Sequence, residues 1–477
     1  MDASSSAVRD LISSLPYSYK ASNSASEIRN DYQRFEGKKV SVAGRITAVR
    51  KSGKLLFADL LDGTGKIQAY FDYSVIGEAE FEKAKRFNAG DMMGVSGEVF
   101  KTKAGEVSVK VSECVMLAKA LRMLPDKWHG LQDIELKYRK RYLDLIMDPK
   151  VRETFVKRSR ILSLVRRFLE SRGFMEFETP TIQPQYGGAD AEPFTTHVNT
   201  LAEDHYLRIA DELYLKRLII GGFEKVYEIC KDFRNEDLDT THSPEFTMIE
   251  WYQAYADYND VMKLTEELFE YIAKELYGAE TITYRGKQLS MKAPFKRVKF
   301  IDSINEKVGK DITKLSDEEL FKLAEGRGIR FDKGKRNRAH AYNKLLEVLV
   351  QPELVQPTFV IDFPKETSTL CRPKRGDPTR VERFEMYVDG MEMNNAYSEL
   401  QNPVIQRENF DEEVKKAQAG DKEAEPLDDD FIEAMEHGMP PTGGLGMGID
   451  RLVMLFTDSP SIKDVILFPM EKRGKSK

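Results

Sequence analysis

The sequence predicts an α+β protein with two domains, a small β-barrel followed by a larger domain in which helices flank a mostly antiparallel sheet. Three observations predict this fold class. The chain has 477 residues, which is too long for one ordinary hydrophobic core. Short alternating strands separated by glycines begin at Gly37. From Val151 onward, strands alternate with longer amphipathic helices.

The composition is that of a globular protein with balanced charge. Hydrophobic residues make up 41% of the chain, and 73 basic against 79 acidic residues give a net charge of −6. This excludes a disordered chain and a uniformly basic nucleic-acid coat, but it allows a local basic patch. The three cysteines lie far apart, and no apolar run reaches the length of a membrane span. We therefore expect a cytoplasmic protein with reduced thiols and no membrane partner.

The first 119 residues predict an N-terminal extension over 1–35 and a barrel domain over 36–119. The extension is rich in Ser and Ala, with one short helix expected near Val8–Leu15. The barrel strands are expected at residues 40–49, 55–61, 67–71, 92–100 and 106–118, with a helix over 78–87. Five strands with a helix between the third and the fourth are typical of an OB-fold barrel, a common binder of single-stranded nucleic acid.

One side of this barrel has the residue types that bind RNA. Six basic residues and no acidic residue lie between Gly37 and Ala58. These cations could contact the nucleic-acid backbone, Phe57 could stack on a base, and Gln68 could read a base edge. A merely charged barrel surface is the alternative interpretation.

A linker over 120–150, basic at its end, leads to the second domain over 151–477. An amphipathic helix is expected over 151–172, capped by Gly173 and followed by a strand that ends at Pro180. Further expected elements are helices over 211–220 and 259–277, strands over 225–233 and 358–363, and a helical insertion over about 293–350.

Residues 233–252 predict a hairpin with an unusual polar face. Arg234 and Glu236 open it, a polar loop follows, and Phe246, Met248, Glu250 and Tyr252 then alternate along one face of the second strand. A cation on one arm and a carboxylate on the other could bind a phosphate and an amine together. An edge hairpin with a solvated face is the alternative.

A second hairpin, over 382–399, turns at Asp389-Gly390 and groups Glu385 with Glu392. Paired carboxylates repel each other unless a divalent cation lies between them, and oxygen ligands favour Mg²⁺. A solvated acidic surface would have the same pattern.

Two glycine-rich segments could complete a pocket. Glycines at 443, 444, 446 and 448 precede a buried helix that has Arg451 near its start, which favours a backbone that approaches a ligand closely. Gly187-Gly188 and the later Glu212 could form a pocket floor and accept an amine. For this second segment, a turn and a helix cap are the alternative.

Taken together, these segments resemble the class II aminoacyl-tRNA synthetases, and specifically the lysyl-tRNA synthetases. The helix and strand up to Pro180 resemble the first motif of that class, which lies at a dimer interface. Residues 233–252 resemble the second motif, and Gly444–Arg451 resembles the third. The resemblance implies a catalytic domain with an antiparallel sheet flanked by helices, and an anticodon-binding OB-fold domain.

The resemblance also implies roles for particular residues and partners. The implied catalytic residues are Arg234 and Arg451. The implied ATP-binding residues are Arg234, Asn235, Glu236, His242, Ser243, Phe246, Glu385, Met386, Gly448, Ile449, Asp450 and Arg451. The implied lysine-binding residues are Gly188, Glu212, Arg234, Glu250, Tyr252, Asn395, Tyr397 and Glu399. Glu385 and Glu392 would bind Mg²⁺, and Arg50, Phe57 and Gln68 would bind the anticodon. The implied partners are ATP, L-lysine, tRNA(Lys) and a second copy of the chain in a homodimer.

Two departures and three alternatives remain. Ser243 stands where the family often has asparagine, and Glu192 stands where a basic residue is common. An aspartyl- or asparaginyl-type tRNA synthetase shares the barrel and the motifs, but the acidic pocket candidates favour a cationic substrate. A lysine ligase that modifies a protein is the second alternative, but such relatives typically lack an anticodon-binding barrel. A catalytically inactive RNA-binding or signalling homologue is the third, and the intact motif residues favour an enzyme.

Overall fold

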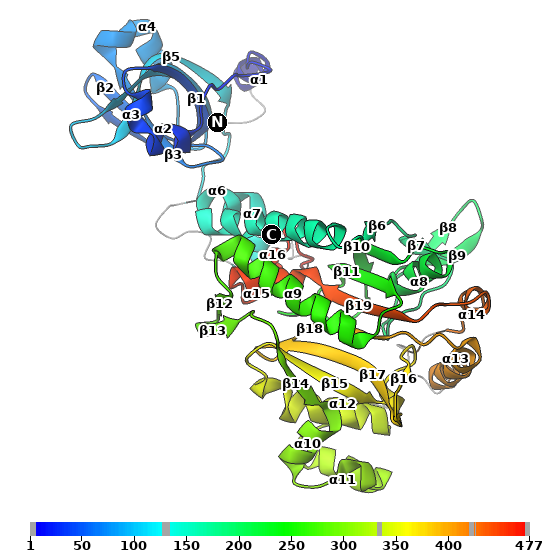
Figure 1. Cartoon of the computed structure of the whole chain (residues 1–477). Coiled ribbons are helices and arrows are strands. Elements are labelled where there is room, and N and C mark those ends of the chain that lie inside the picture. Colours follow the sequence, from blue (N-terminus) through cyan, green and yellow to red (C-terminus); the bar gives the residue numbers. More distant parts are fainter. Residues whose placement is uncertain (1–5, 126–133, 332–335, 419–423, 425, 473–477) are drawn as a thin grey trace. The chain divides into compact units, whose positions relative to one another are not determined.

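The structure, a computed structural model, describes residues 6–125, 134–331, 336–418, 424 and 426–472. The chain divides into two compact units, Met1–Gln132 and Asp133–Lys477, which we describe separately (Figure 1). Residues 1–5 of the predicted extension, 126–133 of the predicted linker, and 332–335 of the predicted insertion lie outside the described residues. No helix in the described ranges is long and apolar enough to cross a membrane.

The first unit is a closed five-stranded barrel with the strand order β1-β2-β3-β5-β4, which confirms the predicted OB fold. Its strands are β1 (Lys39–Ser52), β2 (Leu55–Leu61), β3 (Lys66–Asp72), β4 (Met92–Lys101) and β5 (Val107–Ala118). Its helices are α1 (Ser6–Ser13), α2 (Ala25–Asn30), α3 (Tyr32–Phe35) and α4 (Tyr73–Lys85). Helix α4 begins five residues before the predicted helix, because the Asp72 side chain accepts a hydrogen bond from the Ser74 amide and caps it.

The barrel closes because one face of each strand is apolar. On β2, for example, Leu56, Ala58 and Leu60 are buried and alternate with partly exposed residues. A glycine is needed where β4 bends against β5, because a Cβ on Gly97 would lie 2.0 Å from the Lys110 carbonyl oxygen. The strand register shifts at this point.

The second unit is built on a nine-stranded sheet with the order β14-β15-β17-β18-β19-β11-β10-β6, and β16 pairs with β17. The strands are β6 (Met175–Glu176), β10 (Lys225–Phe233), β11 (Glu245–Ala254), β14 (Lys296–Lys299), β15 (Thr358–Pro364), β16 (Pro373–Lys374), β17 (Asp377–Val388), β18 (Met391–Ser398) and β19 (Thr442–Gly448). All pairs are antiparallel except β14 with β15 and β6 with β10 at the two ends. The predicted antiparallel sheet with flanking helices is confirmed.

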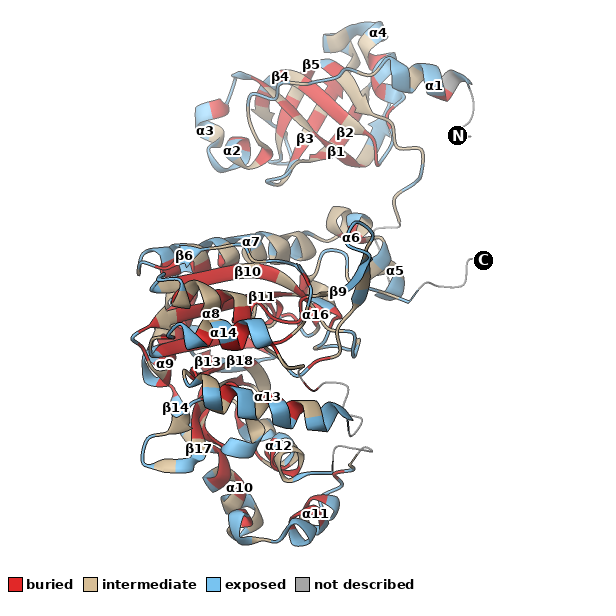
Figure 2. Ribbon diagram, turned by 90° about the vertical axis from the view of Figure 1, so that its right-hand side faces the viewer, coloured by how far each residue is buried: buried red, intermediate tan, exposed pale blue. Residues whose placement is uncertain are grey.

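Three helices form the main core with this sheet: α7 (Pro149–Glu170), α9 (Tyr258–Tyr277) and α15 (Ile449–Thr457). Trp251, Phe269 and Phe359 are fully buried among them, and Figure 2 shows the buried strands at the centre of the unit. The large rings account for much of the stability, because burying one aromatic side chain removes about 150–250 Å² from water. The predicted strand up to Pro180 was too long, since only the two residues of β6 pair with β10.

The remaining helices surround the sheet. They are α5 (Ile134–Arg139), α6 (Arg141–Met147), α8 (Glu212–Ile220), α10 (Phe300–Val308), α11 (Asp317–Glu325), α12 (Arg338–Leu349), α13 (Pro403–Gln418), α14 (Asp429–Glu436) and α16 (Ile462–Val465). Short 3₁₀ turns lie at Ile312–Lys314, Gln351–Glu353 and Lys365–Thr367. Two smaller sheets comprise β7 (Ile182–Gln183), β8 (Thr195–Val198) and β9 (Glu203–Leu207), and β12 (Thr281–Tyr284) and β13 (Lys287–Ser290).

Candidate functional site

A pocket of about 380 Å³ lies in the second unit, over strands β11, β18 and β19 and beside the start of α8. Most of the site residues that the sequence predicts for ATP, lysine and Mg²⁺ line it. They are Gly188, Glu212, Arg234, Glu236, His242, Ser243, Phe246, Glu250, Tyr252, Glu392, Asn395, Tyr397, Gly448, Asp450 and Arg451. Five segments far apart in the sequence therefore form one site.

Five of the predicted residues are not among those that line the pocket. Met386 and Ile449 are fully buried in the hydrophobic core. The Asn235 amide donates a hydrogen bond to the Glu192 carbonyl oxygen at 2.7 Å. Glu399 is buried, and Glu385 is partly buried.

Strand β11 forms one wall through its period of two. Phe246, Glu250 and Tyr252 line the pocket, whereas Ile249 and Trp251, on the opposite face, belong to the hydrophobic core. Alternate residues of a strand point to opposite faces, so one strand serves both the site and the core. The predicted polar face is confirmed. Met248, whose place in this alternation is the same, also lines the pocket.

One end of the pocket carries two guanidinium groups. The Arg234 amide donates to the Pro244 carbonyl oxygen at 2.9 Å, and its guanidinium lies 5.1 Å from the centre of the Phe246 ring. Arg451 donates to the Glu392 carbonyl oxygen at 2.8 Å and lies 3.3 Å from His242 Nε2. Two fixed cations in a partly enclosed site are suited to bind phosphate and carboxylate groups.

Asp450 lines the pocket, but its carboxylate is engaged inside the protein. Arg158 on α7 donates to Asp450 Oδ1 at 2.5 Å, and the Thr247 amide on β11 donates to Oδ2 at 2.7 Å. The side chain of Asp450 is 2% exposed. This ion pair joins α7, β11 and α15, and so it holds Arg451 in place on α15.

The opposite end of the pocket is acidic and is organised by Lys216, a residue that the sequence did not single out. The Lys216 ammonium forms ion pairs with Glu212 on its own helix and with Glu399 after β18. The Tyr397 hydroxyl also donates to Glu212 Oε1 at 2.7 Å. The spacing of Glu212 and Lys216, four residues apart on one helix face, was the signal in the sequence.

Glu250 is a buried carboxyl at this acidic end. It is 3% exposed, and its Oε2 accepts a hydrogen bond from the Tyr252 hydroxyl at 2.7 Å. Burial raises the pKa of Glu250 to about 8, and the charges of Glu212 and Asp232 add to the rise. The group therefore has a strong preference for a cation or a proton as its neighbour.

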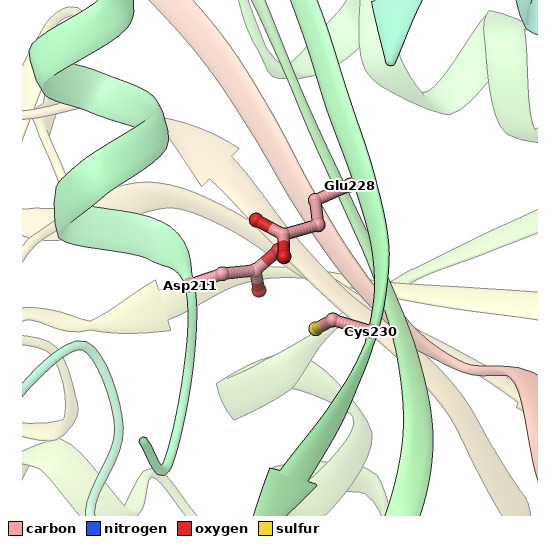
Figure 3. Close-up of side chains that lie close together, drawn as sticks. All are labelled: Asp211, Glu228 and Cys230. Carbon is pink, nitrogen blue, oxygen red and sulfur yellow. The ribbon is translucent and has the colours of Figure 1, made fainter. Parts of the chain in front are cut away.

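Further acidic and thiol groups lie behind Glu250. Figure 3 shows Asp211, Glu228 and Cys230 pointing toward one another, with ligand atoms within 4.8 Å. Asp211, Asp232 and Glu250 form a second such group. No nitrogen or hydroxyl donor in the described part of the chain bonds to Asp211. Burial and then the Glu250 charge raise the pKa of Asp211 well above its usual value, and its carboxyl faces Glu250.

The group in Figure 3 is poorly suited to bind a metal ion. Glu228 already accepts hydrogen bonds from Arg208 Nη1 at 2.7 Å and from the Thr179 amide at 3.0 Å. Burial raises the pKa of the Cys230 thiol far above its usual range, and the thiol donates to Asp232 at 3.4 Å. A metal ion would have to displace this proton, because the thiolate is the binding form.

The predicted Mg²⁺ pair, Glu385 and Glu392, lies on β17 and β18. Glu385 Oε1 accepts a hydrogen bond from Arg383 Nη2 at 2.7 Å, and its Oε2 accepts one from the Tyr387 hydroxyl. Burial raises the pKa of Glu385, Arg383 opposes this rise, and the Glu392 charge adds to it. Glu392 faces the pocket and is 41% exposed. The repulsion between the two carboxylates fits a shared divalent cation, with Glu392 as the more open ligand.

In the barrel, Arg50, Phe57 and Gln68 lie on the neighbouring strands β1, β2 and β3. Arg50 donates to Asp59 at 2.8 and 3.1 Å, and Gln68 accepts a hydrogen bond from the Ser108 hydroxyl at 3.0 Å. Phe57 contacts Tyr70 with the ring centres 5.2 Å apart. Tyr70 is a further partly exposed ring that the sequence analysis did not single out, although its alternation with Gln68 on β3 was a signal.

Comparisons with known proteins agree with both units. Residues 40–117 match the family described as "OB-fold nucleic acid binding domain", and residues 133–472 match "tRNA synthetases class II (D, K and N)". The chain is 48% identical over 455 residues to a protein of Thermoanaerobacter pseudethanolicus named lysine–tRNA ligase, which covers 95% of this chain and 91% of that protein. The lysine–tRNA ligase of Clostridium perfringens is 47% identical over 462 residues, covering 96% and 92%.

A third relative, the lysine–tRNA ligase of Clostridium acetobutylicum, is 48% identical over 459 residues, covering 96% of this chain and 89% of that protein. These matches extend over both units and across the whole pocket. The chain therefore belongs to the class II tRNA synthetases of the D, K and N group and, within that group, to the lysine–tRNA ligase family.

Proposed function

We propose that the protein is a lysine–tRNA ligase that uses ATP to activate L-lysine and then transfers the lysyl group to the 3′ end of tRNA(Lys). The observation that carries this proposal is the polarity of the pocket. Arg234 and Arg451 lie at one end, and the buried carboxyls of Glu212 and Glu250 lie at the other. Lysine has one carboxylate and two ammonium groups, so it complements both ends.

In the first step, the lysine carboxylate attacks the α-phosphorus of ATP. A bond forms between a carboxylate oxygen of lysine and the α-phosphorus. The bond between the α-phosphorus and the oxygen that bridges to the β-phosphorus breaks, and pyrophosphate leaves. The nucleophile is already an anion, so no general base is required. Arg234 and Arg451 would orient the reacting groups and neutralise the charge on the phosphates. In the second step, a hydroxyl at the 3′ end of the tRNA attacks the lysyl carbonyl carbon, and the bond from that carbon to the phosphate oxygen breaks. AMP leaves, and the hydroxyl proton passes to the departing phosphate.

For ATP, we propose that the adenine ring stacks between Phe246 and Arg451, with Glu236 and Asn235 at its edge. Glu236 Oε1 accepts a hydrogen bond from the Glu192 amide at 3.0 Å, which fixes the orientation of its carboxylate. His242 and Ser243 would approach the far phosphates. Glu385 and Glu392 would hold Mg²⁺, which supplies positive charge to the phosphate oxygens when it is bound.

For lysine, we propose that Gly188 and Glu212 receive the α-ammonium and that Glu250, Tyr252 and Glu399 surround the ε-ammonium. Asn395 and Tyr397 would complete the pocket wall. The Glu399 carboxylate can approach because residue 444 is a glycine, since a Cβ there would lie 2.2 Å from Glu399 Oε1. This oxygen is buried and accepts no hydrogen bond within the described residues.

We further propose that Arg50, Phe57 and Gln68 bind the anticodon, that the protein acts in the cytoplasm, and that it forms a homodimer. The homodimer is supported by partly exposed apolar residues on and after α7, such as Val156, which is 62% exposed, and Met175, which is 45% exposed. Sedimentation equilibrium would measure the mass in solution, and a monomer at micromolar concentration would contradict the dimer.

The test of the function is ATP–pyrophosphate exchange with each of the twenty amino acids, followed by charging of total tRNA. We expect exchange with lysine alone and charging of tRNA(Lys). Exchange with aspartate or asparagine instead would favour an aspartyl- or asparaginyl-type tRNA synthetase. Binding of tRNA without any amino-acid-dependent exchange would favour an inactive homologue.

A further inference from the structure

Lys216 occupies an unusual position for a lysine side chain. Its side chain is 2% exposed, and those of its two ion-pair partners, Glu212 and Glu399, are 6% and 0% exposed. The rings of Tyr252 and Tyr397 lie 5.9 and 5.4 Å from its ammonium. An ammonium enclosed by carboxylates and aromatic faces is a bound cation, supplied here by the chain itself.

The charges around Lys216 can be counted from these contacts. Glu212 and Glu250 line the acidic end of the pocket, Glu399 is buried beside it, and Lys216 supplies one ammonium to Glu212 and Glu399. Among these four groups, two negative charges remain when the three carboxyls are ionised. The lysine substrate carries two ammonium groups, so the complex would be neutral at this end. Without Lys216 there would be three carboxylates for two ammonium groups, and a buried, uncompensated carboxylate takes up a proton.

We propose that Lys216 is a positioning residue for amine recognition, whose ammonium holds the side chains of Glu212 and Glu399 in place and gives the acidic end the charge that matches a substrate with two ammonium groups. The inference rests on the proposed activation of lysine. Lys216 does not contact the reacting atoms in this account. It acts through the two glutamates that it holds.

Other groups near Lys216 are consistent with this role. Burial lowers the pKa of Lys216, but the Glu212 and Glu399 charges outweigh it and raise the pKa above the usual value, so the group remains an ammonium. The polar and charged groups of the surrounding elements come from three strands or helices and from the segments beside them. Helix α8 contributes Glu212 and Arg217, with Asp211 just before it, and Asp428 lies just before α14. Strand β11 contributes Glu250 and Tyr252, the end of β18 contributes Tyr397 and Glu399, and Cys371 forms a backbone β-bridge with Glu399. Arg217 and Asp428 neutralise each other at 3.0 Å.

The experiment compares Lys216→Met and Lys216→Gln with wild type in lysine-dependent ATP–pyrophosphate exchange over a range of pH. Methionine keeps the length of the side chain, and glutamine keeps a hydrogen-bond donor, but neither carries charge. For both, we expect the KM for lysine to rise by roughly 30-fold or more, with the KM for ATP changed less than about threefold. We also expect the acid limb of kcat/KM for lysine to move up by about one pH unit, because the glutamates lose the cation that favours their ionised form.

A matched control is Lys225→Met, since Lys225 donates to the Arg172 carbonyl oxygen at 2.9 Å and packs over Phe174, away from the pocket. We expect wild-type kinetics for it. Lys216→Arg, which keeps the charge, should have an acid limb like that of wild type. If a folded Lys216→Gln or Lys216→Met has the wild-type KM for lysine and the wild-type acid limb, the inference is wrong. If wild type itself shows no lysine-dependent exchange, the proposed function fails instead.

Discussion

At the scale of single residues, the main feature of the pocket is the burial of several charged side chains. Glu250 and Glu399 are at most 3% exposed, and isolated ions at that depth would cost several kcal/mol each. The protein limits this cost with the Lys216 ammonium and with the Tyr252 hydroxyl. The negative charge that stays unpaired at these carboxyls favours the binding of a further cation. The ammonium selectivity that we propose would therefore follow from charges that the empty pocket leaves incompletely paired.

The pKa of Glu250 gives the first prediction. Burial raises it from 4.5 to about 8, so the ligand-free folded state holds a proton there that the unfolded state loses at lower pH. Its contribution to stability is full below pH 4.5 and is lost as the pH rises through about 8. A bound ammonium favours the ionised form, so lysine should bind more tightly as the pH rises, by up to about tenfold per pH unit below pH 8.

Calorimetry of lysine binding across this pH range measures the effect, and a proton should be released on binding. Glu250→Gln should bind lysine weakly at every pH and should show no proton release. Glu266→Gln is the control, because Glu266 is a buried carboxylate that pairs with Arg297 outside the pocket. Lysine affinity in wild type that does not change with pH would contradict the assignment of Glu250.

At the scale of secondary-structure elements, β19 and α15 illustrate how a strand and a helix serve a site. Strand β19 lies between β18 and β11, so its glycines face ligand-binding side chains from both neighbours. Helix α15 follows directly and carries Arg451 to the pocket while Leu452 and Val453 pack into the core. The apolar pattern of α15 and the glycines of β19 can both be recognised in the sequence. The sequence does not show which side chains these two elements pack against.

The glycine at 444 gives a prediction for β19. In Gly444→Ala, the added methyl would lie 2.2 Å from Glu399 Oε1 and 2.3 Å from the Tyr252 ring. Because Glu399 is held by Lys216, we expect the Tyr252 ring to move and lysine-dependent exchange to fall by at least about 100-fold, since a displacement near 1 Å can cost that much. Gly63→Ala, at a glycine whose Cβ would have open space, is the control. Unchanged lysine kinetics in a folded Gly444→Ala would show that the contact does not matter.

The ion pair between Arg158 and Asp450 gives a prediction about the joint between α7, β11 and α15. Arg158→Met leaves the Asp450 carboxylate buried with only the Thr247 amide as a donor. We expect a loss of about 3–5 kcal/mol in the free energy of unfolding, as for other buried pairs with one partner removed. Urea denaturation measures it. Lys150→Met, an exposed position on the same helix, should change stability by less than about 0.5 kcal/mol, and an equal loss in both would contradict the assignment.

At the scale of the whole molecule, the two units divide the proposed task. The barrel unit holds the candidate anticodon residues, and the second unit holds every residue of the pocket. Because each unit has its own hydrophobic core, changes on the barrel surface should leave the pocket intact.

Phe57→Ala tests this division. We expect the KM for tRNA(Lys) in the charging reaction to rise by about tenfold or more, because loss of one stacked base costs about 1–3 kcal/mol. Lysine-dependent pyrophosphate exchange without tRNA should be unchanged. Tyr17→Ala, which removes a fully exposed ring from the same unit, is the control and should leave both reactions unchanged. Loss of exchange in Phe57→Ala would mean that the barrel has another role.

The sequence by itself determined the fold class, the five-stranded barrel with its helix, and the polar face of β11, because these depend on local periodicity and glycine placement. It also indicated most of the pocket, since the motif residues stand at readable spacings. Only the tertiary structure decided that Lys216 holds Glu399, that Asp450 is engaged by Arg158, and that Asp211 faces Glu250. Each of these depends on two groups from distant segments that meet in a buried space, and a linear pattern does not record which buried charges become neighbours.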